Sequence, residues 1–165
     1  MNGHYMRAAT PARLMEALGP VIAAAPDASA IRTALDGGAK APLEALMPGL
    51  AERAKTLVDL LDSARFLFAV RPLAMDEKAA KLLSDDARAH LRAVHTRLGA
   101  LDTWTVESVE AAVRAYVSEA DAKLGKVAQP LRAALTGTNT SPGIFDVIAA
   151  LGREEALGRI EDQAA

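Results

Sequence analysis

Apolar side chains recur at helical spacing along most of the 165-residue chain. A helix brings residues three and four positions apart onto one face, and such stripes mark its buried side. The clearest stripes are Leu57, Leu60, Leu61 and Leu67 in one segment, Leu91, Val94, Leu98 and Leu101 in a second, and Val106, Val109, Val113, Tyr116 and Val117 in a third. No segment alternates with a period of two for long enough to predict a strand. The pattern therefore predicts an all-α fold.

Prolines and small polar residues divide this pattern into helices with short connections. Pro11 follows a threonine and predicts a helix start, whereas Pro20 follows a glycine and predicts that the same helix ends there. Pro48 is expected to interrupt the helical segment around it. Ser141 and Pro142 have the order of an N-cap and a first helical residue, which predicts a helix over "GIFDVIAAL". The punctuation favours a pair of small helical bundles.

Composition narrows the function classes. Hydrophobic residues make up 51% of the chain and aromatic residues 4%, which is typical of packed helices. The absence of cysteine excludes disulfides and thiolate metal sites. Apolar runs are too short for a membrane span and the start lacks a signal core, so we expect a soluble cytoplasmic protein without a membrane partner. The net charge of −2 speaks against a broad nucleic-acid surface, although Lys123, Lys126 and Arg132 form a local strip without an acid.

Catalytic and metal-binding patterns are missing from the sequence. His90 and His95 lie five positions apart, about 140° around a helix, so they do not form the metal-binding pair that a spacing of four would give. Glu154 and Glu155 stand at a predicted helix start, where carboxylates favour the helix dipole. No phosphate-binding glycine loop and no G-x-S-x-G context occur. We therefore expect no catalytic residue, metal site or cofactor in this chain.

The stretch "QPLRAALTGTNTSPGIF" (129–145) is the most distinctive one. Pro130 lies within a predicted helix, Arg132 follows it, and a loop of small residues leads to the predicted helix start at Ser141. Unpaired N–H groups at a helix start attract acceptors, and an arginine fork facing them can bind a base edge or a phosphate. The residues alone leave open an ordinary capped loop with a solvated arginine, or a contact with a small molecule, phosphate or RNA.

Residues 123–160 closely resemble the C-terminal end of bacterial glutamyl-tRNA synthetases. These enzymes typically read K-x-G-x-x-x-x-P-L-R-x-A-x-T-G, then [ST]-P-x-[IL]-F-[ED], then L-G-[KR]-E, and the chain follows this order. The segments 53–68, 76–83 and 2–7 and the Trp104 region are similar to the family as well. The resemblance covers essentially the whole chain.

The resemblance implies the all-helical anticodon-binding region of such an enzyme. It implies two subdomains, 1–75 with a segment that contacts the tRNA stem, and 76–165. The signatures of the family's catalytic half do not occur here. Alone, the chain is thus expected neither to activate glutamate nor to charge tRNA, and ATP and magnesium would belong to the parent enzyme's catalytic half.

Site residues also follow from the resemblance, by position in the matching motifs. Arg132 is implied to hydrogen-bond an anticodon base, with Ser141, Pro142 and Ile144 forming the pocket beside it. Arg53 aligns with an arginine that in some members reads the third anticodon base and favours tRNA for glutamate over tRNA for glutamine. The expected partner is tRNA for glutamate, with tRNA for glutamine left open, and a monomer is expected.

A second interpretation comes from a different class of function. A helical protein-interaction module derived from the same fold could have lost RNA binding, and the slightly acidic balance of the chain is compatible with it. Binding of tRNA that depends on the anticodon distinguishes the two.

Overall fold

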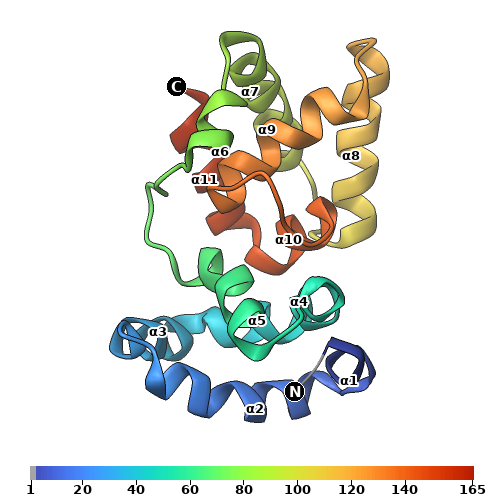
Figure 1. Ribbon diagram of the computed structural model, residues 1–165. Coiled ribbons are helices and arrows are strands. Elements are labelled where there is room, and N and C mark those ends of the chain that lie inside the picture. Colours follow the sequence, from blue (N-terminus) through green and yellow to red (C-terminus); the bar gives the residue numbers. More distant parts are fainter. Residues whose placement is uncertain (1–2) are drawn as a thin grey trace. The chain divides into compact units, whose positions relative to one another are not determined.

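The computed structural model of the chain describes residues 3–165 (Figure 1). They form two compact units, of which the first ends at Ala69 and the second spans Val70–Ala165. All regular elements in this part of the chain are helical, without a strand, so the all-α prediction is confirmed. None of the helices described is both long and apolar enough to cross a bilayer.

Two of the sequence predictions reach beyond these observations. The segment 2–7 begins with Asn2, which lies outside the described residues. The division into functional subdomains at residues 75 and 76 stays a prediction, and the two compact units are described separately below.

Unit 1 is built around α4. This helix packs against α1, α2 and α5, and its face toward them carries the fully buried Leu43, Met47 and Leu50. The elements of the unit are α1 (Gly3–Ala8), α2 (Pro11–Ala24), α3 (Ala28–Ala34), the π-helical turn η1 (Leu35–Ala39), α4 (Lys40–Arg53), α5 (Leu57–Ala64) and the 3₁₀ turn η2 (Arg65–Phe68).

Unit 2 is built around α9, which packs against every other helix of the unit (Figure 1). Its buried side holds Val127, Leu131 and Leu135, which have no exposed surface. The helices of the unit are α6 (Glu77–Lys81), α7 (Asp85–Gly99), α8 (Val106–Glu119), α9 (Leu124–Thr136), α10 (Ile144–Leu151) and α11 (Arg153–Ala164). Because so many neighbours fix α9, side chains at its end are carried on a rigid support.

The apolar stripes read from the sequence form the cores of both units. Their central members are buried, namely Leu60, Leu61 and Leu67 on α5 and η2, Leu91, Val94 and Leu98 on α7, and Val109 and Val113 on α8. The members at the stripe ends, such as Leu57 and Leu101, are half-buried. Helical periodicity thus predicted the core correctly.

The helix start predicted at Pro11 is confirmed, but the interruptions predicted at Pro20 and Pro48 are wrong. The helix α2 continues through Pro20, and α4 continues through Pro48. A proline inside a helix removes the hydrogen bond to the carbonyl four residues earlier. Those carbonyls belong to Glu16 and Glu44, which are exposed residues on the water side of the helices. Apolar residues on both sides of each proline share one buried face, and their packing keeps each helix continuous.

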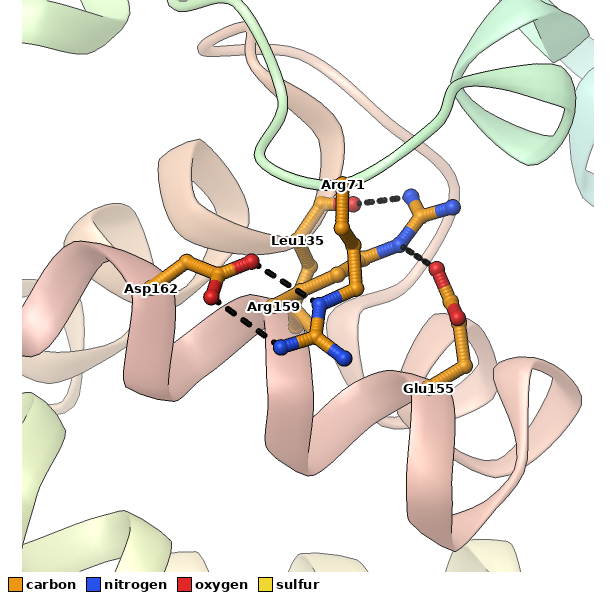
Figure 2. A network of polar contacts seen from close by, with 5 residues as sticks. All are labelled: Arg71, Leu135, Glu155, Arg159 and Asp162. Atoms are coloured by element: carbon orange, nitrogen blue, oxygen red, sulfur yellow. Dashed lines mark hydrogen bonds and ion pairs between the residues drawn. The ribbon is translucent and has the colours of Figure 1, made fainter.

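An arginine from the start of unit 2 lies on the last helix of that unit. The guanidinium of Arg71 donates from Nε to Oδ2 of Asp162 at 2.8 Å and from Nη2 to Oδ1 at 3.0 Å (Figure 2). It lies directly against Gly158, where an added Cβ would come within 2.1 Å of Nη1. The hydrogen bond from Arg71 lowers the pKa of the Asp162 carboxyl. The same hydrogen bond raises the pKa of the Arg71 guanidinium. The pair fastens the chain before α6 to α11.

The same segment also lies against the end of α9. The N–H of Asp76 donates to the carbonyl of Gly137 at 2.9 Å. Gly137 follows the last helical residue with a φ of 74°, a left-handed conformation that glycine adopts without strain. A Cβ at Gly137 would lie 2.5 Å from the carbonyl oxygen of Ala74. Glycine is therefore required both by the backbone conformation and by the close approach.

We expect Asp162→Asn to lower the free energy of unfolding by about 0.5–1 kcal/mol at pH 7, a small value because Arg71 is 36% exposed and solvent screens the pair. The folded pKa of Asp162 is below its unfolded value of about 3.9, so the stabilisation is present above that value and is lost as the pH falls through the folded pKa. Urea unfolding of both proteins across acid pH measures this. If the difference in the free energy of unfolding between the two proteins were as large at the lowest pH as at pH 7, the stabilisation by the Arg71–Asp162 pair would be contradicted.

Gly137→Ala is expected to destabilise unit 2 by about 1–2 kcal/mol through the left-handed backbone alone, and further through the clash with Ala74. Gly125→Ala in the first turn of α9 is the matched control, since a Cβ there meets nothing within 4 Å. Alanine at Gly125 should leave stability equal or raise it by about 0.5–1 kcal/mol. Denaturant midpoints compare the two, and equal effects would show that the left-handed turn is not required.

Candidate nucleic-acid interface

The candidate interface lies where α9 ends and a loop leads to α10. Arg132 stands one turn before the end of α9, and its carbonyl accepts a hydrogen bond from Thr136 Oγ1 at 2.7 Å. The N–H of Gly137 donates to the carbonyl of Ala133 at 2.8 Å and closes the helix. The last turn is thus fixed by a hydroxyl and by a left-handed glycine, two ordinary ways of satisfying helix-end carbonyls.

Threonine hydroxyls hold the loop after α9. The N–H of Thr138 donates to Thr136 Oγ1 at 3.3 Å, and Thr138 Oγ1 donates to the carbonyl of Thr140 at 2.8 Å. Short side chains that bond to the backbone two residues away favour tight turns. The small hydroxylated residues of "TGTNT" therefore supply a turn with internal hydrogen bonds rather than a flexible connection.

Arg132 and Ser141 meet across this loop. The Nε of Arg132 donates to Ser141 Oγ at 2.9 Å, and the serine hydroxyl donates in turn to the carbonyl of Pro142 at 2.7 Å. Ser141 and Ile144 are 6% and 5% exposed, and Pro142 is also buried, whereas Arg132 is half-buried. Four of the predicted site residues are thus brought together. Three of them are buried, and Arg132 beside them remains partly exposed to solvent.

The predicted helix start at Ser141 and Pro142 is wrong. The helix α10 begins at Ile144 with Gly143 as its N-cap, two residues later than expected. The Ser141 hydroxyl does not cap the helix because it bonds to the Pro142 carbonyl and to Arg132. The unpaired amides at the helix start accordingly belong to Ile144 and the residues after it.

A carboxylate already occupies the start of α10. Asp146 lies in the first turn, and an added Cβ at Gly143 would come within 2.8 Å of its Oδ2. A carboxylate at this end satisfies the positive end of the helix dipole. A phosphate there would meet a like charge, so the geometry favours a neutral hydrogen-bonding partner, such as a base edge, over an anion.

The fifth predicted site residue belongs to unit 1. Arg53 is the last residue of α4 and is exposed. No side-chain hydrogen bond or ion pair joins it to another residue among 3–165. Its guanidinium is available to a ligand, and its place at a helix end is stabilised by the C-terminal dipole.

Sequence reasoning missed a buried arginine behind the loop. Arg159 on α11 is 2% exposed and donates from Nη1 to the carbonyl of Leu135 at 2.8 Å and from Nε to Oε1 of Glu155 at 2.8 Å (Figure 2). A signal existed in the sequence, since Glu155 and Arg159 are four apart and Ala156 and Ile160 beside the arginine are apolar and buried. An arginine within an apolar stripe indicates a buried polar contact.

Comparison with known proteins identifies the family. The model of the family "Anticodon binding domain" matches residues 13–164. The chain is 54% identical over 163 residues to "Glutamate--tRNA ligase 1" of Brucella melitensis and to "Glutamate--tRNA ligase 2" of Brucella abortus. Each alignment covers 99% of this chain and 34% of the relative, so the chain spans about a third of the length of these curated proteins.

Solved structures give the same fold. A glutamate tRNA ligase from Elizabethkingia meningosepticum superposes with a TM-score of 0.75 at 22% identity, covering 99% of this chain and 30% of that one. The glutamate-tRNA synthetase of Elizabethkingia anophelis gives 0.73 at 21% identity, with the same coverages. The resemblance read from the sequence motifs is confirmed: this chain belongs to the anticodon-binding domain family and is homologous to part of the glutamate–tRNA ligases.

Proposed function

We propose that the chain recognises the anticodon of tRNA for glutamate as part of a glutamate–tRNA ligase. The observation that carries the proposal is the placement of Arg132 against Ser141 beside the α10 start, in a chain of the anticodon-binding family. The interaction-module alternative is not favoured, because the identity to glutamate–tRNA ligases extends over 99% of the chain.

Recognition in this proposal depends on satisfied hydrogen bonds. Unstacked loop bases expose their Watson–Crick edges, and a half-buried guanidinium oriented by Ser141 is a planar donor group suited to acceptors on one such edge. The buried Pro142 and Ile144 provide apolar surface beside the base. A wrong base leaves a polar group without a partner, at a cost of about 1–3 kcal/mol.

The remaining parts of the proposal concern the parent enzyme. Ligation of glutamate, with its ATP and magnesium, is assigned to a catalytic part resembling the rest of the longer relatives, and this chain supplies tRNA selection. The setting is the cytoplasm, where charged tRNA is used. One copy of the chain carries the residues needed for recognition, so we propose that it acts as a monomer.

Arg132→Ala should weaken binding of tRNA for glutamate by about 1–3 kcal/mol and reduce discrimination against a changed anticodon. Arg132→Lys should keep the salt dependence but not the discrimination, since lysine retains the charge without the planar fork. Titration of labelled tRNA at two salt concentrations measures both. Arg97→Ala is the control expected to bind normally; it removes an arginine of α7 that is paired with Glu119 of α8. Wild-type binding that ignored the anticodon would refute the proposed function.

Arg53→Gln should bring the affinities for the glutamate and glutamine tRNAs closer together, because the exposed guanidinium is proposed to read the third anticodon base that separates them. The expected change in their ratio corresponds to about 1–3 kcal/mol. Parallel titrations with both tRNAs test this, with Lys55→Gln as a neighbouring exposed cation for control. An unchanged ratio of the two affinities would show that Arg53 does not distinguish the two tRNAs.

A further inference from the structure

The buried Arg159 satisfies a backbone group that the end of α9 leaves unpaired. Inside a helix, the carbonyl of Leu135 would accept from the amide of Asn139, but Asn139 lies in the loop beyond Gly137. Leu135 itself has no exposed surface, so its environment is dry. The Nη1 of Arg159 donates to this carbonyl at 2.8 Å and takes the place of the missing amide (Figure 2).

Glu155 lowers the energetic cost of burying the positive charge of Arg159. Its Oε1 accepts from the Nε of Arg159 at 2.8 Å, one turn earlier on α11, while its own side chain stays 39% exposed. Arg159 is 2% exposed, and a guanidinium buried to this degree is costly unless a partner is present. The glutamate both neutralises the arginine and sets the direction in which Nη1 points.

The turn held by Arg159 is the one that carries Arg132. Within it, Thr136 Oγ1 bonds to the Arg132 carbonyl at 2.7 Å, and Arg132 reaches from it to Ser141 at 2.9 Å. Groups that recognise a ligand by hydrogen bonds need to be held within about 0.5 Å of the productive geometry. Fraying of the last turn of α9 would therefore misplace the guanidinium that the site presents.

We propose that Arg159, oriented by Glu155, is a positioning residue for anticodon recognition: it fixes the last turn of α9 and thereby the direction of the Arg132 guanidinium. The effect on anticodon recognition rests on the proposed function. The effect of Arg159 on the last turn of α9 does not. Arg159 would thus influence anticodon specificity although its side chain is buried and does not itself contact the RNA.

The structural part is tested without RNA, in the full 165-residue chain. Arg159→Lys and Glu155→Gln are suitable variants because each retains a polar group, and a single ammonium lacks the planar fork that serves both partners. Amide hydrogen exchange of residues 136–144 should accelerate in both variants at least about threefold more than exchange in α7 and α8. Arg153→Lys is the control, since Arg153 begins the same helix but donates to Gly99 and Leu101. Unchanged exchange at 136–144, or the same change in the control, overturns the proposal.

The consequence for recognition is tested by a double-mutant cycle. The ratio of dissociation constants for tRNA with a changed anticodon and for tRNA for glutamate should fall about 3- to 30-fold in Arg159→Lys, at a temperature where melting curves show the variant folded. In an Arg132→Ala background, Arg159→Lys should cause no further fall. An equal fall in both backgrounds would mean a merely structural role and overturns the proposal. A wild-type ratio of one would instead refute the proposed function, leaving hydrogen exchange as the deciding test of positioning.

Discussion

One hydrogen bond, from Arg132 to Ser141, joins the two sides of the α9–α10 loop and defines the candidate interface. It holds the guanidinium at the edge of a packed wall formed by Ser141, Pro142 and Ile144. The bond requires that the end of α9 and the residues before α10 keep a fixed separation. The left-handed Gly137, the threonine hydroxyls of the loop and the carbonyl contact of Arg159 all act on that separation. The geometry of the candidate interface therefore depends on how α9 ends.

Charge at this interface favours hydrogen bonding over simple attraction. The chain carries a net charge of −2, and Asp146 lies at the helix start beside the site. Phosphate binding would need an excess of positive charge, whereas a base edge needs donors and acceptors in fixed directions. A rigid arginine whose Nε is held by a serine meets the second need. Recognition by geometry, with modest electrostatic attraction, is consistent with these features.

Sequence patterns predicted the helices and their buried faces, because periodicity reflects which side of a helix leaves water. They also placed Arg132 and Ser141 near each other through the loop that joins them. They failed at Pro20 and Pro48, where packing on one face outweighs a lost backbone bond on the water side. The start of α10 was missed because the Ser141 hydroxyl bonds to Arg132, a contact between elements. The contact between Arg159 and the Leu135 carbonyl was missed for the same reason, since the two residues lie 24 positions apart.

The most direct measurement is nuclear magnetic resonance of the arginine side chains during titration with RNA hairpins that carry the glutamate anticodon. The Nε–H resonance of Arg132 should shift progressively and saturate with this hairpin, and should shift far less with a hairpin whose anticodon is changed. A resonance that stayed in place throughout, or that moved equally with both hairpins, would contradict base recognition by this arginine.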